Sequence, residues 1–591
     1  MKRLLLLLIL ALPLHAKPAI RWEPWSGDVF ARAAREHRFV LLDLEAVWCH
    51  WCHVMDEMTY SDQRVIGLIN QRYIAVRVDQ DSRPDLSNRY EDYGWPATIV
   101  FAADGSEIVK RSGYIPPMPM ASMLQAIIDD PSPGPSVVKE APPVFGKDAA
   151  LAPSLRAQLE KTYVERYDAQ HGGWGFIHKY LDAPSVEVAL ARARRGDAAA
   201  AKMARQTIDG ERNLLDPAWG GVYQYSTGGV WSEPHFEKIM SMQAGNLRVA
   251  SLAYALWHEP RDLDMAQSIH RYLVTFLRSP EGAFYTSQNA DLVDGEHAGE
   301  YFALPDAKRR AKGIPRVDTH LYARENGWAI EALATLAMSS GDARALAEAR
   351  EAAEWVLAHL HRPGGGFQHG AQPASNAGGP YLGDTLSMGR AFLALYAATG
   401  ERIWLRRAQE AATFIDVKFR ANPGYVTASV AALVDRAHAP LAHTPGGRWQ
   451  RDENCDVARF ANLLHHYDGD PKHEAMARNA MRYLAAPEVA APAPVGNVLL
   501  TDLELRGQPL HVTVVGAKGD ANARALFGAA AALPDVYKQV EWLDRREGPL
   551  PGSTVEYPSM TKAAAFVCSS NRCSRPAFTA AELRTLVSRL E

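Results

Sequence analysis

The sequence lacks the features that assign many chains to a class at once. Its 591 residues contain only five cysteines, too few for disulfides to form the framework of so large a protein. The formal net charge of −4 gives no electrostatic reason to expect binding to nucleic acid or to an anionic membrane surface. After the first residues, no stretch offers about 18 apolar residues in a row, so we expect no membrane span in the mature chain.

The first residues have the pattern of a secretory signal peptide. A basic start, Met1-Lys2-Arg3, precedes an apolar run over residues 4–12, and the small residue Ala16 stands where cleavage would fall. Residues 1–16 are therefore expected to be removed, and the mature protein to be periplasmic or otherwise exported. Disulfides persist in such a compartment, so the few cysteines can have specialised roles.

Residues 17–130 have the pattern of an α/β domain. An apolar, β-rich strand over residues 39–44 runs directly into the first two cysteines. The surrounding pattern predicts helices at 28–37 and 51–70, strands at 73–79, 94–102 and 107–113, a turn at Asp104-Gly105, and a last helix ending near residue 130. This order predicts an α/β sandwich of about a hundred residues, the first part of a multidomain chain.

Helical periodicity dominates the middle of the chain. A proline-rich linker, residues 131–150, leads into apolar residues at three- and four-residue steps across residues 151–490. A glycine–aromatic signal recurs near residues 171, 219, 280, 363 and 422, with room for two helices in each interval. We expect a closed (α/α)6 toroid of helical hairpins whose loops crowd one end of a cavity; an open helical solenoid is the alternative. Residues 491–591 regain β character and predict a small C-terminal α/β segment.

Cys49 and Cys52 stand at the join between the buried strand and a helix. The sequence Cys49-His50-Trp51-Cys52-His53 is compatible with a redox dithiol, half of a zinc site or a c-type haem attachment. At a helix start, unpaired backbone N–H groups and the helix dipole favour a thiolate, which predicts Cys49 as the attacking sulfur. Cys52, one turn later and less exposed, would resolve the mixed disulfide.

Two further residues support a redox dithiol. Asp43 lies on the strand six residues before Cys49 and is expected to point into the core, where it could relay a proton to or from Cys52. Pro96 precedes a strand, and a cis Trp95–Pro96 bond would set backbone polar groups against the dithiol to bind an extended substrate segment.

These motifs together resemble a known family. The Asp43 strand, the sequence Trp-Cys-His-Trp-Cys-His-Val-Met at 48–55, the Pro96 strand and Gly113 look like the thioredoxin fold. The whole chain is similar to the spermatogenesis-associated type of thioredoxin-domain protein, which has bacterial YyaL-like members. Further matches lie at residues 172–176 with Lys179 nearby, 220–226, 231–238, 283–291, 317–327, 382–384 and 566–573. The resemblance implies a thioredoxin-like domain joined to a six-hairpin toroid, without an assigned reaction.

Metal and haem are the weaker interpretations of the cysteine pair. Haem needs a pocket that a compact sandwich hardly provides, and zinc needs a second pair of ligands. His50 and His53 are also expected to point away from a common centre with the cysteines. We therefore expect no metal and no cofactor, while a structural disulfide without turnover stays open. Cys568 and Cys573 are close enough in sequence for a stabilising disulfide, and Cys455 is expected to be a buried apolar residue.

The toroid loops carry residue types that a carbohydrate pocket uses. Aromatic faces stack on sugars, and carboxylates or histidines act as acids and bases in hydrolysis or epimerisation. The candidates are Trp174, Lys179, Trp231, His235, Glu237, Lys238, Asn289, Asp291, Asp318, Asn326 and Asp384. Each also has an ordinary structural interpretation, as an ion pair, a hydrogen-bonded histidine or a core tryptophan. The chain departs from the family pattern at residues 179–181 and 239–243 and at Glu325, so a shared substrate is not implied.

Three functions are compatible with this sequence. The leading hypothesis is an exported thiol–disulfide oxidoreductase whose Cys49–Cys52 pair exchanges with protein or small-molecule thiols and disulfides, while the toroid recognises the substrate or partner. The alternative is a carbohydrate-active enzyme, an epimerase or hydrolase, with a carbohydrate-like ligand in the toroid and a regulatory thioredoxin-like domain. The third is a binding or quality-control protein without turnover.

Overall fold

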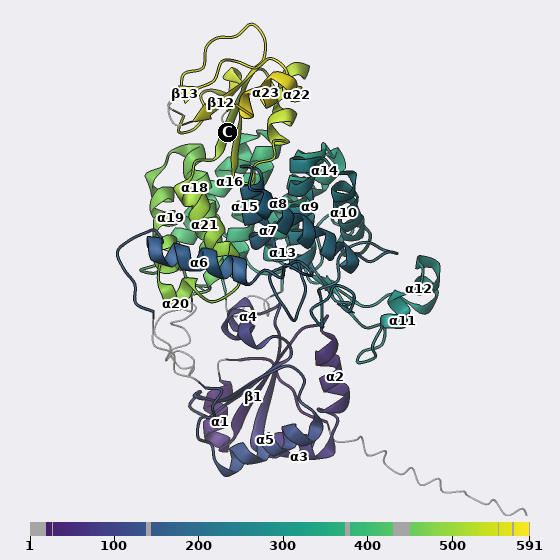
Figure 1. The fold of residues 1–591 in the computed structure, drawn as a ribbon. Helices are drawn as coiled ribbons and strands as arrows, with labels where there is room; N and C mark the ends of the chain where they lie inside the picture. The colour runs from purple at the N-terminus through teal and green to yellow at the C-terminus, as the bar shows by residue number, and fades with distance from the viewer. Residues whose placement is uncertain are drawn as a thin grey trace, which may run out of the picture.

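The computed structural model describes residues 19–26, 28–137, 143–372, 379–428, 449–553, 555–569 and 572–589. Within these residues a helical ring lies between two α/β domains (Figure 1). The expected signal peptide and residues 138–142 of the linker fall outside the described residues. No helix in the described part of the chain is both long and apolar enough to cross a membrane.

A four-stranded sheet forms the centre of the N-terminal domain. Its order is β2-β1-β3-β4. Strand β1 (Phe39–Glu45) is parallel to β2 (Tyr73–Asp79) and antiparallel to β3 (Ala97–Phe101), which pairs with β4 (Glu107–Ser112). Successive side chains of β1 enter two separate cores, one on each face of the sheet. Because both faces are buried, the sequence of the strand is a nearly continuous apolar run. This arrangement confirms the thioredoxin-like fold that the sequence predicted.

Five helices cover the sheet: α1 (Val29–Glu36), α2 (His50–Met58), α3 (Gln63–Arg72), α4 (Pro84–Tyr90) and α5 (Pro117–Asp129). Helices α2, α3 and α5 contribute to one core, and α1 and α4 to the other. The helix predicted over residues 51–70 is two helices, because the Asp62 side chain accepts the backbone N–H groups of Arg64 and Val65 and starts α3. Helix α4 occupies a stretch that was predicted to be a loop, and Pro84 starts it.

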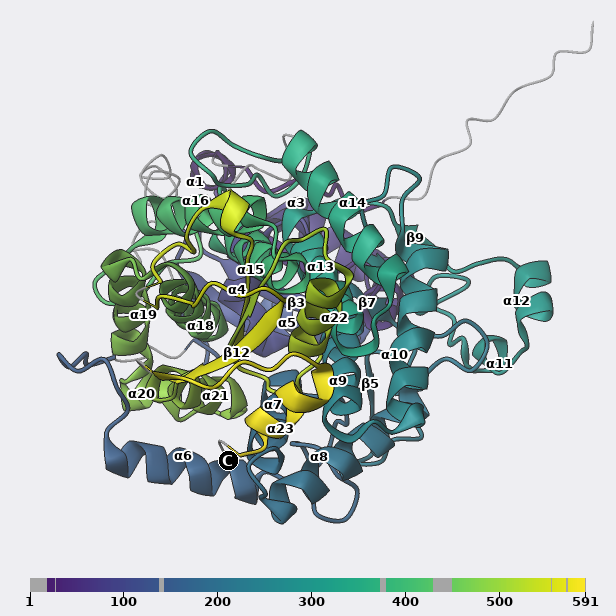
Figure 2. The same cartoon turned by 90° about the horizontal axis from the view of Figure 1, so that it is seen from above.

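Six inner helices form a closed ring. They are α7 (Ala183–Ala193), α9 (Met240–Trp257), α13 (Ala323–Ser340), α15 (Leu382–Thr399), α18 (Arg451–Asp468) and α21 (Gly496–Arg506). Each packs against the next, and α21 packs against α7. The outer partners are α8 (Ala198–Glu211), α10 (Pro260–Tyr272), α14 (Ala343–His359), α16 (Arg402–Phe419), α19 (Pro471–Leu484) and α6 (Pro153–Glu165). Figure 2 shows this double ring from above. Closure confirms the (α/α)6 toroid over the solenoid, and the ring continues to Arg506, past the expected end at residue 490.

A repeated backbone contact explains the recurring glycine–aromatic signal. Short hairpins follow four outer helices and are closed by the bridges Leu215–Val222, Arg278–Phe284, His361–Phe367 and Arg420–Tyr425. In each, the last residue donates its N–H to the side chain of the fourth residue of the next inner helix: Gln243, Asn326, Thr385 or Asn454. The tight hairpins require positive φ, as at Gly221 and Gly365. The recurring signal therefore marks the contacts that fix each hairpin to the ring.

The C-terminal domain has the same sheet topology as the N-terminal one. Strand β10 (Leu510–Val515) is parallel to β11 (Lys538–Leu543) and antiparallel to β12 (Ala564–Ser569), which pairs with β13 (Arg572–Cys573). The order is β11-β10-β12-β13. Helix α22 (Ala521–Ala531) and strand β11 contact the inner helices α13, α15 and α18. The two α/β domains therefore cover opposite ends of the toroid (Figure 1).

Cys568 and Cys573 form a disulfide between β12 and β13 (Arg572–Cys573), where the two residues are direct cross-strand partners. Cys455 lies in α18, is fully buried and has no disulfide partner. Burial raises the pKa of the Cys455 thiol well above its ordinary value, so this cysteine is inert packing in the ring.

Candidate functional site

The cysteine pair lies where β1 gives way to α2. Cys49 is the N-cap residue of α2, and the backbone N–H of Cys52 donates to its Sγ at 3.1 Å. The two sulfur atoms form a disulfide, with 5.3 Å between the Cα atoms. The Trp95–Pro96 peptide bond beside the pair is cis, and Trp95 packs against the two cysteines. The chain therefore brings a reducible sulfur pair to the start of a helix in a thioredoxin-like sheet.

The prediction that Cys49 is the more exposed of the two was wrong. Both cysteines are only 3% exposed. The toroid is the physical reason, because Ile239 packs on the pair and the N–H of Ala290 donates to the Trp48 carbonyl at 3.3 Å. Arg316 adds a contact to the carbonyl of Val47. The docked toroid therefore contributes to the burial of the cysteine pair.

Two histidines of the motif bind one carboxylate of the toroid. His50 Nδ1 lies 2.7 Å from one oxygen of Asp291, and His53 Nδ1 lies 3.0 Å from the other. They therefore converge on Asp291, a partner that was not predicted for either ring. Within the described residues, no group of histidines and cysteines is close enough to hold a metal. We call this three-residue contact the His50–Asp291–His53 latch.

Electrostatic attraction between the Asp291 carboxylate and the histidine rings stabilises the latch. Burial lowers the pKa of His50, but the hydrogen bond and charge of Asp291 outweigh burial, so that this pKa lies above its ordinary value of 6.5. Burial raises the pKa of Asp291, yet the hydrogen bonds from both histidines hold it below its ordinary value. The His50 contact therefore stabilises docking fully below pH ~6.5 and loses that contribution as the pH rises through the raised pKa.

Replacing Asp291 by asparagine is expected to open the dithiol to large reagents. The change removes the charge that holds both histidines, and a loss of about 1.4 kcal/mol of docking would raise the open fraction about tenfold. In the reduced protein, the rate at which a polyethylene-glycol maleimide labels Cys49, divided by the rate for iodoacetamide, should rise at least about tenfold. Peptide mass spectrometry identifies the labelled cysteine. The matched control is Glu296→Gln, because Glu296 is an exposed carboxylate five residues after Asp291 in the sequence. An equal rise in both variants would contradict the latch.

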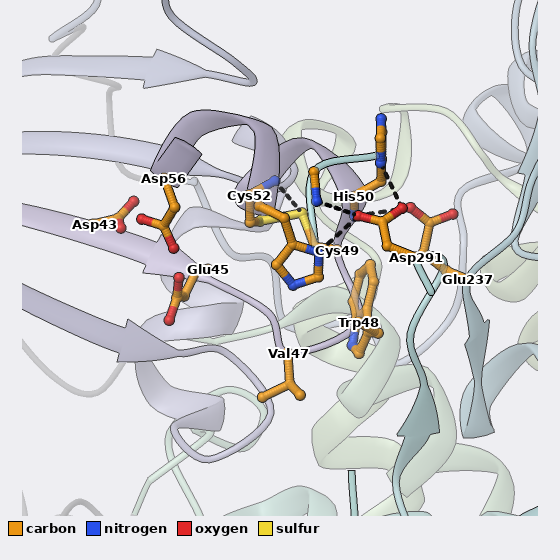
Figure 3. The surroundings of a disulfide bond; sticks show 12 residues. Asp43, Glu45, Val47, Trp48, Cys49, His50, Cys52, Asp56, Glu237 and Asp291 are labelled. Atoms are coloured by element: carbon orange, nitrogen blue, oxygen red, sulfur yellow. Dashed lines mark hydrogen bonds and ion pairs between the residues drawn. A yellow bond between two sulfur atoms is a disulfide. The ribbon is translucent and has the colours of Figure 1, made fainter. Parts of the chain in front are cut away.

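Glu237 lies on the same side of α2 as the latch. Its Oε1 accepts the backbone N–H of His50 at 3.3 Å, while its Oε2 has no hydrogen-bond partner among the described residues. The side chain belongs to the toroid and is 3% exposed. Burial raises the pKa of Glu237 to about 7. Figure 3 shows Glu237 and Asp291 together on one side of the cysteines, and Asp43, Glu45 and Asp56 on the other.

A cavity of about 330 Å³ opens between the motif and the toroid. His235 forms part of its wall and stacks on Tyr225, with 4.3 Å between ring centroids. Burial lowers the pKa of His235 to about 4, so the ring is neutral at physiological pH. Trp51 is 40% exposed at the edge of the cavity. The remaining lining residues include His50, Phe236, Glu237, Asp291 and His297.

Asp43 is engaged by a cation and is not free beside Cys52. Arg77 donates its Nε–H to Asp43 at 3.1 Å and also pairs with Glu45 and Asp56. These three carboxylates are close enough together for a metal, but the guanidinium already contacts each of them. Burial raises the pKa of Asp43 to about 6, against the charge of Arg77. A proton relay through Asp43 would have to act within this ion cluster.

The two lysines predicted for a sugar pocket stabilise loops instead. Lys179 donates to Asp168 at 2.6 Å, and Lys238 donates to Asp216 at 2.7 Å; each also donates to carbonyls of its glycine-rich loop. Both lysines are 1% exposed. Arg309 is a second cation on Asp216. The same lysine–aspartate contact is thus used in two consecutive repeats.

Other predicted pocket residues are also occupied by the protein itself. Trp174 donates its indole N–H to the carbonyl of Tyr163, and Trp231 donates to that of His171. Asn326 binds Phe284 on both its N–H and its carbonyl, as one of the four repeated hairpin contacts. These buried side chains therefore hold the ring together through the contacts that they make within the protein.

Asn289 and Asp318 shape loops near the domain interface. Asn289 accepts the backbone N–H of Asp291 at 3.0 Å and donates to Asp294, which orients the loop that presents the latch carboxylate. Asp318 lies 2.5 Å from Nδ1 of His320. Asn289 therefore acts on the dithiol site indirectly.

The N-terminal domain covers the end of the toroid where a sugar was expected to enter. Asp384 binds Nδ1 of His369 at 2.8 Å, and Nε2 of that ring binds the carbonyl of Asp81, just after β2. Asp384 and Glu325 lie in the first turns of α15 and α13, where the positive ends of the helix dipoles favour carboxylates. The acidic side chains Glu325 and Asp384 thus lie at the end of the toroid that the thioredoxin-like domain covers.

The sequence analysis missed three lining residues of the cavity. Phe236, Trp51 and His297 were not chosen, although Trp51 lies between the two cysteines. Glu237 and Asp291 were chosen, but for a sugar pocket and not for contact with the motif. The spacing of His50 and His53, three residues apart on one helix face, was the available sign of a common partner.

The fold and the site define a thioredoxin-like domain with a cysteine pair, docked on an (α/α)6 toroid. A family model, Thioredox_DsbH, described as a protein of unknown function (DUF255), matches residues 10–129. The chain is similar to spermatogenesis-associated protein 20 of Rattus norvegicus, with 25% identity over 312 residues, which are 47% of this chain and 39% of that protein. The matched part thus spans about two fifths of that curated relative. These findings confirm the family resemblance.

Two further similarities concern separate parts of the chain. The thiol:disulfide interchange protein DsbD of Campylobacter jejuni is 32% identical over 78 residues, which are 13% of this chain and 14% of that protein. The solved structure of a sugar epimerase from a ruminal bacterium matches 60% of this chain and 99% of its own, at 13% identity and a TM-score of 0.44.

Proposed function

We propose that this protein is an exported thiol–disulfide oxidoreductase in which Cys49 and Cys52 carry the electrons and the toroid controls access to them. One observation carries the proposal: Cys49 caps α2, receives the N–H of Cys52 on its sulfur, and is within bonding distance of the Cys52 sulfur. The likeness of one segment to a thiol:disulfide interchange protein supports it. The basic and apolar start of the sequence supports export.

The chemistry follows from this geometry. In the reduced protein, the helix start favours a thiolate on Cys49, which attacks a disulfide and expels one thiolate. Cys52 then attacks the Cys49 sulfur of the mixed disulfide, the ring seen here closes, and the second thiolate leaves. Two electrons pass from the dithiol to the substrate, and the reverse sequence oxidises a dithiol.

The test measures the dithiol directly. Protein reduced with dithiothreitol and freed of it is mixed with glutathione disulfide, and the state of each cysteine pair is read by alkylation and peptide mass spectrometry. The Cys49–Cys52 pair should interconvert with the glutathione buffer and yield an equilibrium constant. A background with both Cys568→Ser and Cys573→Ser removes the other disulfide. A pair that resists dithiothreitol in the native protein, or that neither glutathione disulfide nor the smaller bis(2-hydroxyethyl) disulfide oxidises, would contradict the proposal.

A carbohydrate-active toroid is not proposed. Within the described residues, Lys179, Lys238, Trp174 and Asn326 are used in the ring's own contacts, and the mouth of the toroid is occupied by the segment around Asp81. The contacts of Glu237 and Asp291 with His50 instead connect the toroid to the dithiol.

A further inference from the structure

The cavity beside the dithiol holds a buried acceptor that the protein leaves unused. Among the described residues, Glu237 Oε2 has no partner although the side chain is 97% buried, that is, 3% exposed. Leaving a buried acceptor without a hydrogen bond is unfavourable. A ligand that donates a hydrogen bond to this oxygen would therefore be bound more tightly. Glu237 also lines the cavity of about 330 Å³ together with the start of α2.

The volume of the cavity and the burial of the cysteines favour a small molecule as the substrate. A volume near 330 Å³ is at the lower end of ligand pockets, which run from about 300 to 1,000 Å³. Both cysteines are 3% exposed, and Trp95 and Ile239 pack against them. A folded protein surface would have to displace the toroid, whereas a small disulfide fits a cavity lined by His50 and Trp51, the two residues between the cysteines.

The charges around the cavity favour a positively charged substrate. The latch is balanced, because the Asp291 carboxylate faces the two histidines of the motif. His235 is neutral, since burial lowers the pKa of its ring to about 4. Above its raised pKa of about 7, Glu237 adds a negative charge to the cavity. Its Oε1 already accepts the first N–H of α2, which would otherwise attract an anion.

The aromatic rings that line the cavity also favour a positively charged substrate. Phe236 and His297 lie with 5.8 Å between ring centroids, and Trp51 stands at the edge of the cavity. Aromatic faces attract ammonium groups and accommodate the short alkyl chains next to them.

We propose that the substrate of the Cys49–Cys52 pair is a small disulfide that bears an ammonium group, which Glu237 Oε2 accepts as a hydrogen-bond donor. This inference rests on the proposed function. In the reaction, the Cys49 thiolate forms a bond to one substrate sulfur, the substrate S–S bond breaks, and one aminothiolate leaves and takes a proton from water. The Cys52 thiolate then bonds to Cys49 and releases the second aminothiolate, so the dithiol loses two electrons and the substrate gains them.

The test uses three symmetrical disulfides that differ in end group: cystamine with ammonium, bis(2-hydroxyethyl) disulfide with hydroxyl, and 3,3′-dithiodipropionate with carboxylate. Each oxidises the reduced Cys568→Ser/Cys573→Ser protein at pH 8, where Glu237 is ionised, and each rate is divided by the rate of the same disulfide with dithiothreitol. The normalised rate for cystamine should exceed that for the hydroxyl compound about tenfold, and dithiodipropionate should be slowest. Glu237→Gln should bring the cystamine-to-hydroxyl ratio close to one, while the exposed Glu233→Gln on the same loop should leave it unchanged.

The outcomes separate the two proposals. If no disulfide oxidises the pair, the proposed function fails. If all three oxidise it at equal normalised rates, or if the ratio survives in Glu237→Gln, the substrate class is wrong while the oxidoreductase function stands. Because the charge preference is measured in the unaltered site as well, a variant that fails to fold does not remove the test.

Discussion

Cys49→Ser is expected to abolish disulfide exchange, and Cys52→Ser to stop it halfway. The first sulfur makes the attacking bond, and a serine hydroxyl at the same N-cap is not a nucleophile toward disulfides. The second sulfur only resolves the intermediate. The Cys52→Ser protein should therefore take up one substrate half and keep it on Cys49, which intact-mass spectrometry detects as a single covalent addition that dithiothreitol removes.

The control for this pair is Cys455→Ser. Cys455 is fully buried in α18 and has no disulfide partner, so its loss should leave exchange unchanged. Equal exchange in the Cys49→Ser, Cys52→Ser and Cys455→Ser proteins would show that the pair carries no electrons. Trapping on Cys52 in the Cys49→Ser protein, with none on Cys49 in the Cys52→Ser protein, would reverse the assigned roles.

The local part of the site was predictable from the sequence. An apolar run that ends in a cysteine pair and continues with helical spacing specifies a buried strand, a turn and a helix, and β1 and α2 are found there. These signals act over a few residues, because strand and helix periodicities are set by neighbouring side chains. The break at Asp62 was equally local, and its N-cap position could have been recognised.

The partners of the site were not predictable in the same way. Glu237 contacts His50 across 187 residues of sequence, and Asp291 contacts it across 241. Residue type marked Glu237 and Asp291 as functional, but nothing in their spacing tells which domain they face. A single sequence contains no signal for the docking of two surfaces, so the contacts of these carboxylates with His50 were not predicted.

The repeat was predicted from the sequence, but the contacts that cause it were not. The glycine–aromatic signal correctly indicated a repeat of helical hairpins. The side chains that hold the loops between these hairpins differ in type from repeat to repeat: Gln243, Asn326, Thr385 and Asn454. Asn326 was predicted to contact a ligand, and the other three were not predicted to have a role. The C-terminal sheet repeats the N-terminal topology without a cysteine pair at the strand–helix join, so its sequence carries no motif by which to recognise it.

Asp216→Ala is expected to lower the stability of the toroid by about 3–5 kcal/mol, since breaking a buried ion pair leaves an uncompensated charge in the core. Asp216 accepts Lys238 and Arg309, each at 2.7 Å, and all three side chains are at most 1% exposed. Burial raises the pKa of Asp216, but the charges of Lys238 and Arg309 keep it below its ordinary value. Its contribution is therefore fully present above pH ~3.8 and is lost as the pH falls through the lowered pKa.

The measurement is the denaturant midpoint of the ring, followed by far-ultraviolet circular dichroism, together with hydrogen exchange at residues 216–223. In Asp216→Ala the denaturant midpoint should fall sharply, and the backbone amides of residues 216–223 should exchange faster. Glu165→Ala is the matched control, because Glu165 pairs with Lys161 at 3.6 Å with both side chains more than 60% exposed, and such surface pairs contribute about 0–1 kcal/mol. A loss in Asp216→Ala no larger than in Glu165→Ala would mean that Lys238 and Arg309 find water or another partner, and Lys238 would return to the list of residues free to bind a ligand.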